Sequence, residues 1–308
     1  MKNLFIVNPN AGTRQAKQHL PDILEIFGRH GGLNHVYITS KRGDAVKFTA
    51  DHAESADRII CIGGDGTLNE VITGLQTGKF SLPVGYIPAG TANDFANSLD
   101  ISKNMISAAE NIIKGKATPV DIGRFIPAGE TAVNRYFSYI ASFGAFTRVS
   151  YNTPQSSKNM LGHLAYVIEG IKELPNIRPE YIKIETAVTG ALNDAPNNFE
   201  GEYIFGAVMN SKSVGGILSV SPGAADMSDG LFEVMLIKPL NNPKAVLDCA
   251  YSLISQNYNS EYISFFKANK ITVRPDPDLK WSLDGERENG GGSIVIENLR
   301  HAVSIIKR

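Results

Sequence analysis

The sequence predicts an α/β plus β fold: an N-terminal α/β domain with a parallel sheet, followed by a larger, mainly antiparallel β-sandwich domain. The chain has 308 residues, about twice the usual size of one domain. Up to Asp121, strand patterns alternate with helix patterns. After Asp121, strand patterns follow one another with few helices between them. We therefore expect one domain over residues 1–122 and a second over 123–297.

Short apolar runs alternate with segments of helical spacing in the first part of the chain. Buried parallel strands form continuous apolar runs, whereas helices repeat apolar residues every three to four positions. The runs predict strands at 4–7, 35–39, 58–62 and 84–87. The helical spacing predicts helices around 20–27, 43–55 and 68–75. Strands joined in this way form βαβ units with right-handed crossovers.

The second part of the chain is rich in strand patterns separated by turn residues, which is typical of an antiparallel sandwich. Strands are predicted at 136–140, 181–186, 203–209, 232–237, 271–273 and 293–296. Helices are predicted at 161–173 and 244–255, and a turn at 193–198.

Composition excludes several classes of protein. Apolar residues make up 43% of the chain and charged residues 20%, as in ordinary globular proteins. Thirty basic residues face 31 acidic ones, so the chain lacks the basic excess of a broad nucleic-acid surface. The two cysteines, Cys61 and Cys249, make neither a disulfide framework nor a zinc quartet. No apolar run is long enough to span a membrane, and the first seven residues are too short for a signal peptide, so we expect a cytoplasmic protein.

The most informative motif is Gly63-Gly64-Asp65-Gly66-Thr67-Leu68-Asn69-Glu70, where an apolar strand gives way to a helix. Glycines allow close approach of the backbone, and a helix N-terminus offers unpaired N–H groups to phosphate. The alternative is a glycine-rich turn in which Asp65 or Thr67 caps the helix. Three glycines around one aspartate exceed what a cap requires, which favours a phosphate site.

Two further polar loops follow predicted strands. Asn8-Pro9-Asn10-Ala11-Gly12 follows the first strand, and Pro88-Ala89-Gly90-Thr91-Ala92-Asn93-Asp94 follows the fourth. Each loop alone could be an ordinary turn. Because ligands of open parallel sheets bind at the carboxyl ends of the strands, three such loops predict one binding crevice.

These motifs resemble those of the diacylglycerol kinase catalytic-domain family, which includes soluble bacterial lipid kinases and, more distantly, sphingosine and ceramide kinases. The resemblance rests on the three loops above and continues to the end of the chain. The further matching segments are Pro119-Val120-Asp121-Ile122-Gly123, Leu161-Gly162-His163-Leu164-Ala165-Tyr166, Asp226-x-x-Asp229-Gly230-Leu231 and Leu283-Asp284-Gly285-Glu286.

The resemblance implies a nucleotide-binding α/β domain, a β-sandwich domain for the lipid, a cleft between them, and a return of the final residues, about 298–308, to the first domain. It implies an enzyme that transfers the γ-phosphate of ATP to a lipid hydroxyl such as that of diacylglycerol, with Mg²⁺, in phospholipid biosynthesis. The residues that would contact ATP are Asn8, Pro9, Asn10, Ala11, Gly12, Thr39, Gly63, Gly64, Asp65, Gly66, Thr67, Leu68, Asn69 and Thr91.

The resemblance also implies a metal site at Asp226, Asp229 and Leu231, the last through its carbonyl oxygen. Two carboxylates and a carbonyl are hard oxygen ligands of the kind that Mg²⁺ takes. The alternative is a simple β-turn, because Ser228-Asp229-Gly230 has ordinary turn chemistry.

Asp284 and Glu286 are the candidate acids for the chemistry. On a strand, positions i and i+2 share a face, so both could point into one site; Asp-Gly is also a common hairpin turn. The family pattern favours Glu286 as the acceptor of the hydroxyl proton, with Asp284 beside it and Asp65 as a competing candidate. By resemblance, Asp65, Asp94, Asp121 and Asp284 would hold a network of Mg²⁺ and water.

Two other functions remain open at this stage. The first is a kinase of a soluble substrate, similar to NAD kinases, and the second is a nucleotide-binding regulator without turnover. The lipid kinase would meet its substrate at a membrane surface through transient association. The resemblance also allows a homodimer.

Overall fold

The computed structural model of the chain describes residues 1–129, 133–144, 178–187, 198–211, 213–214, 218–219, 226–275 and 279–308. These residues divide into two compact units. The first unit comprises Met1–Ile122 and Arg300–Arg308, and the second comprises Gly123–Leu299.

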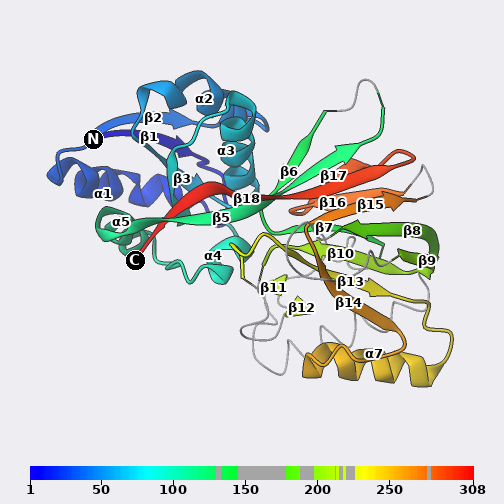
Figure 1. Ribbon diagram of the computed structural model, residues 1–308. Helices are drawn as coiled ribbons and strands as arrows, with labels where there is room; N and C mark the ends of the chain where they lie inside the picture. Colours follow the sequence, from blue (N-terminus) through cyan, green and yellow to red (C-terminus); the bar gives the residue numbers. More distant parts are fainter. Residues whose placement is uncertain are drawn as a thin grey trace. The chain divides into compact units, whose positions relative to one another are not determined.

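The first unit is built on a parallel sheet (Figure 1). Its strands, in the spatial order β2-β1-β3-β4, are β1 (Lys2–Val7), β2 (Leu33–Ile38), β3 (Arg58–Gly63) and β4 (Pro83–Pro88). Each pair of neighbouring strands among these four is parallel. The end of β18 (Ile294–Lys307) adds a parallel strand beside β4, where Ser304 pairs with Pro83.

Helices cover both faces of this sheet (Figure 1). They are α1 (Ala16–Arg29), α2 (Asp44–His52), a 3₁₀ turn (Ala53–Ser55), α3 (Asp65–Gly78), α4 (Asp94–Ser98) and α5 (Met105–Lys114). Residues from α1 and α5 share one apolar core with the side chains of Phe5, Val7 and Ile60. Neighbouring strand residues point to opposite faces of a sheet. The run from Leu4 to Val7 in β1 is apolar because both faces of the sheet are covered there.

The second unit is a sandwich of antiparallel sheets. One sheet has the order β14-β13-β10-β7-β16-β17, and the other contains β18-β15-β8-β9 together with β5 and β6. The bounds of these and two short strands are β5 (Lys116–Pro127), β6 (Arg135–Phe137), β7 (Ile140–Gly144), β8 (Glu180–Ala187), β9 (Asn198–Tyr203), β10 (Phe205–Met209), β11 (Ser213–Val214), β12 (Leu218–Ser219), β13 (Phe232–Ile237), β14 (Ile263–Ala268), β15 (Lys270–Arg274), β16 (Lys280–Leu283) and β17 (Glu286–Asn289).

The core of the second unit lies between its two sheets. Trp281 of β16 is buried there, with its ring edge-on to Phe125 of β5 and Phe143 of β7. On the outer face of the six-stranded sheet, α7 (Pro243–Ser255) packs Cys249 and Leu253 against a second apolar core. The predicted fold class, a parallel α/β part followed by an antiparallel sandwich, is confirmed.

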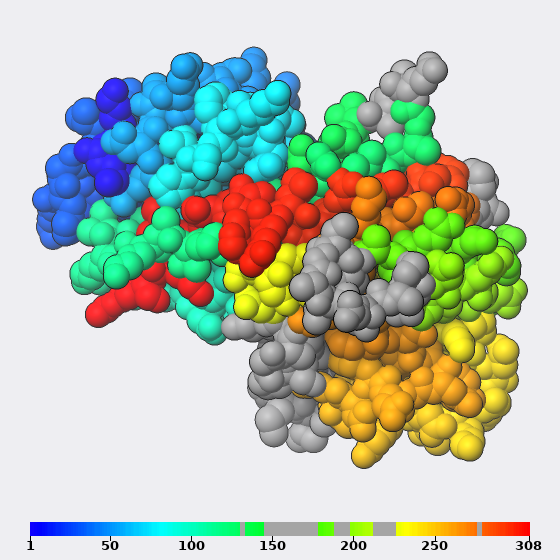
Figure 2. Space-filling view, in the orientation of Figure 1, coloured from blue at the N-terminus to red at the C-terminus, as the bar shows by residue number. Residues whose placement is uncertain are grey.

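Several predicted elements differ in extent from those observed. The predicted strand 136–140 is divided into β6 and β7, and the predicted strand 203–209 into β9 and β10, with Ile204 between them. Most of the predicted strand 293–296 belongs to a much longer strand, β18. The C-terminal part of the chain, which contains β18, is coloured red and is visible at the surface in Figure 2. The predicted helix 161–173 and most of the predicted turn 193–198 lie outside the described residues.

In the part of the chain that the structure describes, no helix is both long enough and apolar enough to span a membrane.

Candidate functional site

Three polar loops meet at the carboxyl edge of the parallel sheet in the first unit. They follow β1, β3 and β4, and backbone hydrogen bonds hold them together. The Asn8 N–H donates to the Ile62 carbonyl at 2.8 Å, and the Ala89 N–H donates to the Gly63 carbonyl at 2.7 Å. The loop after β2 joins them, because the Thr39 N–H donates to the Val7 carbonyl at 2.8 Å. The predicted convergence of these loops is therefore present in the first unit.

At Gly12 and Gly90 the loops approach one another too closely for a Cβ atom, and at Gly64 a Cβ would make a tight contact. A Cβ atom on Gly12 would lie 2.4 Å from the Ala89 carbonyl oxygen, and Gly12 also has a left-handed φ of +50°. A Cβ on Gly90 would lie 2.6 Å from the Gly64 Cα, and one on Gly64 would lie 3.2 Å from the Gly90 Cα. The three loops therefore pack backbone against backbone at this edge, next to the N-terminus of α3, a position that suits phosphate groups.

Asn8 orders the first of these loops. Its side-chain amide donates to the Thr67 hydroxyl at 3.0 Å, and its Oδ1 accepts from the Asn10 N–H at 3.0 Å. Thr67 lies in the first turn of α3, so Asn8 links the loop after β1 to the helix that follows the glycine-rich motif. Of the other predicted ATP contacts, Thr91 is exposed, whereas the Leu68 side chain is fully buried and its N–H donates to the Gly64 carbonyl at 3.1 Å.

Asp65 contacts the N-terminus of α4. Its carboxylate accepts from the Asp94 N–H at 3.1 Å and from the Phe95 N–H at 3.3 Å. Asn93, which precedes α4 with a left-handed φ, accepts from the Gly90 N–H at 2.9 Å through its own Oδ1. The loop after β4 is therefore stabilised by Asn93 within the loop and by Asp65 from outside it. These contacts bring Asp65, at the start of α3, next to the backbone of Asp94, at the start of α4.

Asp121 is fully buried in β5 and has a different neighbour. Its Oδ1 accepts from the His301 N–H at 2.7 Å, at the point where β18 has a left-handed residue. Burial of a carboxylate requires such hydrogen bonds. The observed contact of Asp121 thus serves the backbone of β18 in the first unit.

In the second unit, Asp284 and Gly285 form the turn of a hairpin between β16 and β17. Their φ values are +49° and +86°, as a two-residue type I′ turn requires, and Leu283 pairs with Glu286 across it. The premise that residues 284 and 286 share one strand face is therefore wrong. The hairpin alternative is observed instead.

The Asp284 carboxylate is buried and accepts four hydrogen bonds. Its Oδ2 accepts from the Ser138 N–H at 2.6 Å and from the Ser138 hydroxyl at 2.8 Å, and its Oδ1 accepts from the N–H groups of Tyr139 and Ile140, each at 3.0 Å. Burial raises the pKa of Asp284, and these hydrogen bonds oppose that rise. They also explain why the predicted strand 136–140 is broken: its backbone turns to bind Asp284.

Glu286 has the opposite setting. It is exposed at the first position of β17, next to the turn that Asp284 anchors. The Glu286 side chain is in contact with solvent, whereas the Asp284 carboxylate is enclosed by donors. The role predicted for Glu286 as proton acceptor stays a prediction. The hairpin fixes the backbone position of Glu286, which pairs with Leu283.

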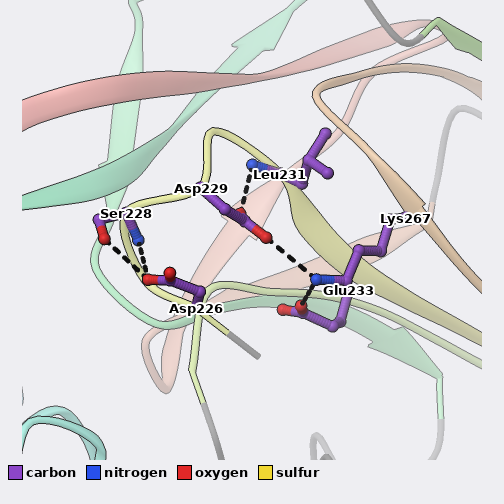
Figure 3. A network of polar contacts seen from close by, with 6 residues as sticks. All are labelled: Asp226, Ser228, Asp229, Leu231, Glu233 and Lys267. Atoms are coloured by element: carbon purple, nitrogen blue, oxygen red, sulfur yellow. Dashed lines mark hydrogen bonds and ion pairs between the residues drawn. The ribbon is translucent and has the colours of Figure 1, made fainter. Parts of the chain in front are cut away.

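The predicted metal residues lie in the short segment before β13 (Figure 3). Asp226 Oδ1 accepts from the N–H of Ser228 at 3.0 Å and from its hydroxyl at 2.7 Å. Asp229 Oδ1 accepts from the Leu231 N–H at 2.9 Å. Both aspartates therefore shape the turn itself, as the turn alternative required.

Two charged residues beside this segment were missed by the sequence analysis. Lys267 of β14 donates to Asp229 Oδ2 at 3.0 Å and contacts Glu233 Oε1 at 3.1 Å (Figure 3). Glu233 is only 1% exposed, and burial raises its pKa to about 7. A charged residue inside the otherwise apolar strand Phe232–Ile237 was the available signal.

The donor chemistry of Asp226, Asp229 and the Leu231 carbonyl fits Mg²⁺, since all three offer hard oxygen atoms. Among the described residues, no group of three or more His, Cys, Asp or Glu side chains could hold a metal ion. Any magnesium site here must therefore include backbone carbonyl oxygen or water among its ligands. The Lys267 ammonium, 3.0 Å from Asp229 Oδ2, would be a positively charged neighbour of such a site.

These features define a class of protein: a parallel-sheet unit in which polar, glycine-containing loops meet at one edge, followed by an antiparallel sandwich. The model of the diacylglycerol kinase catalytic domain matches residues 2–125. The model described as the YegS C-terminal NAD kinase beta sandwich-like domain matches residues 140–306. The chain belongs to the diacylglycerol kinase catalytic-domain family, which confirms the resemblance and makes it a member of a kinase family.

Named relatives match along most of the chain. A diacylglycerol kinase of Bacillus subtilis (strain 168) is 35% identical, with 92% of this chain and 88% of that protein covered. A diacylglycerol kinase of Staphylococcus aureus (strain MRSA252) is 34% identical, with 92% and 85% covered. A crystal structure of a diacylglycerol kinase from Bacillus anthracis str. Sterne has the same fold, with a TM-score of 0.72, 23% identity, and 100% and 97% of the two chains covered.

Proposed function

We propose that this protein is a lipid kinase that transfers the γ-phosphate of ATP to a hydroxyl group of a lipid such as diacylglycerol, with Mg²⁺. The observation that carries the proposal is the close approach of Gly12, Gly64 and Gly90 at the carboxyl edge of the parallel sheet. Such a backbone surface suits phosphate groups, and the named relatives are diacylglycerol kinases. The protein would be cytoplasmic, act on lipid at a membrane surface, and contribute to phospholipid biosynthesis.

In this mechanism, the first unit binds and orients the nucleotide. The N–H groups of the loops after β1, β3 and β4 would bind the phosphates, at the N-terminus of α3, whose dipole favours negative charge. Asn8 and Thr67 keep two of these loops in register through their mutual hydrogen bond. Phosphoryl transfer depends mainly on positioning and on electrostatic stabilisation, so a rigid backbone site meets its main requirement.

The second unit would supply the acidic groups. Glu286 would take the proton from the attacking lipid hydroxyl, and the buried Asp284 would hold the hairpin that presents it. Asp226, Asp229 and the carbonyl of Leu231 would hold Mg²⁺, and a bound Mg²⁺ would supply positive charge of the kind that offsets negative charge in phosphoryl transfer.

A kinase of a soluble substrate is the second candidate, because the matching model of the second unit is described as NAD kinase beta sandwich-like. The deciding experiment incubates the protein with γ-labelled ATP and Mg²⁺ and offers diacylglycerol, ceramide and sphingosine in mixed micelles, or NAD in solution. We expect label in the lipid extract with diacylglycerol. Label on NAD would favour the second candidate, and nucleotide binding without any transfer would indicate a regulator.

A further inference from the structure

Glu70, the last residue of the glycine-rich motif, caps a helix other than its own. It lies on α3, and its Oε1 accepts from the Gly43 N–H at 2.8 Å. Its Oε2 accepts from the Ala45 N–H at 3.1 Å. Both N–H groups belong to the start of α2, where Gly43 has a left-handed φ of +87° and no side chain with which to cap the helix. A carboxylate is the group that such a helix N-terminus favours.

The segment between β2 and α2 is held at both of its ends. At its start, Thr39 donates to the Val7 carbonyl through its N–H at 2.8 Å and through its hydroxyl at 3.3 Å. Toward its end, Asp44 Oδ2 accepts from the N–H groups of Ser40 and Lys41, at 2.8 and 3.0 Å. The segment is thus a closed turn rather than a free loop.

Both ends of this turn are connected to the glycine-rich motif through hydrogen bonds. Val7 precedes Asn8, whose side chain donates to Thr67 of α3. Glu70, one turn further along the same helix, holds the far side of the segment. The helices themselves are packed tightly, since a Cβ on Gly74 of α3 would lie 2.6 Å from the Thr49 Cβ of α2.

We propose that Glu70 is a positioning residue for nucleotide binding: it fixes the segment 39–43 against the glycine-rich motif. This inference rests on the proposed function, because Thr39 is among the residues expected to contact ATP. The two carboxylate oxygens accept one N–H each, so the side chain must offer two acceptor oxygens. Glutamine offers one acceptor oxygen, and its NH₂ group would face an N–H of α2.

The test compares Glu70→Gln with the wild-type protein in two ways. Calorimetry with a non-hydrolysable ATP analogue should show an affinity about threefold to tenfold lower, the effect of one lost hydrogen bond. In kinase assays the KM for ATP should rise by a similar factor, while kcat stays within about twofold of the wild-type value. Glu70→Asp, which keeps both oxygens on a shorter side chain, should recover part of the affinity.

Glu54→Gln is the matched control, because Glu54 is an exposed carboxylate in the same unit; it should leave the affinity unchanged. Amide hydrogen exchange gives a second measurement, since the N–H groups of Gly43 and Ala45 should exchange faster in Glu70→Gln while the strands of the sheet stay protected. Unchanged affinity, or a loss in kcat with KM unchanged, would overturn the inference. If the wild-type protein fails to bind the analogue, the proposed function fails and this inference with it.

Discussion

In the first unit the loops of the candidate site pack closely at three glycines, whereas in the second unit a buried carboxylate organises the candidate hairpin. Gly12, Gly64 and Gly90 allow the loops to pack closely because they carry no Cβ atom. Asp284, in contrast, fixes the backbone of residues 138–140 through the four hydrogen bonds that its carboxylate accepts from them. At these positions we therefore expect different consequences of substitution: an added side chain should be harmful at the three glycines, and a removed charge should be harmful at Asp284.

The largest effect is expected at Glu286. Glu286→Gln keeps the size of the side chain but removes its basic charge, so kcat should fall by roughly two to four orders of magnitude, as for a lost general base. The KM for ATP should change little, because Glu286 is assigned to the acceptor. Steady-state kinetics with lipid in mixed micelles measure both constants.

Glu288→Gln is the control for this variant, because Glu288 lies on the same strand and pairs at the surface with Arg135. It should retain near-wild-type turnover. If Glu286→Gln also retains its kcat, while Asp65→Asn abolishes turnover with ATP still bound, then the proton acceptor is Asp65.

Asp284→Asn should act on stability. The amide brings an NH₂ group toward backbone donors and removes the charge that four donors surround, so the free energy of unfolding should fall by about 3 to 5 kcal/mol. Urea denaturation followed by circular dichroism measures the loss. A variant with wild-type stability and reduced turnover would instead indicate that Asp284 acts directly in the chemistry.

Glycine-rich loops and alternating elements could be predicted from the sequence, because they are local patterns. The strand 58–62 and the motif that follows it are visible as patterns of consecutive residues. The break at Ser138 could not be predicted, since it arises from a carboxylate 146 residues away in the chain. For the same reason the Asp284-Gly285 segment was ambiguous: a hairpin turn and a strand are both compatible with the local sequence.

Long-range contacts also explain what the site prediction missed. Glu70 was part of a recognised motif, yet its partners Gly43 and Ala45 lie on a helix predicted separately. Lys267 is an ordinary lysine in sequence, and only the pairing of β13 with β14, where it lies opposite Glu233, places it near the predicted metal residues.

A branched side chain in the first unit should reduce nucleotide affinity. In Gly64→Val the added methyl groups would meet the backbone of Gly90, which is already 3.2 Å from an ideal Cβ. We expect the affinity for ATP to fall more than tenfold, above roughly 1.4 kcal/mol, with the fold retained. Calorimetry measures this. Gly28→Val is the control, because a Cβ on Gly28 has no neighbour within 4 Å.

The smallest effect is expected at the predicted metal segment. Asp229→Ala removes a hard oxygen ligand, so half-maximal activity should require a severalfold higher Mg²⁺ concentration. A titration of activity against Mg²⁺ measures the shift, with Asp248→Ala on the exposed face of α7 as the control. Unchanged Mg²⁺ dependence would mean that this segment is only a turn.

The central claim is that nucleotide phosphates bind to the backbone of three loops in the first unit. Hydrogen exchange of the whole chain, measured by mass spectrometry with and without a non-hydrolysable ATP analogue and Mg²⁺, tests it most directly. Bound phosphates would accept hydrogen bonds from backbone N–H groups and restrain the three loops, so exchange should slow within residues 8–12, 63–67 and 89–95. Slower exchange confined to other segments, or no change in these three, would contradict the account.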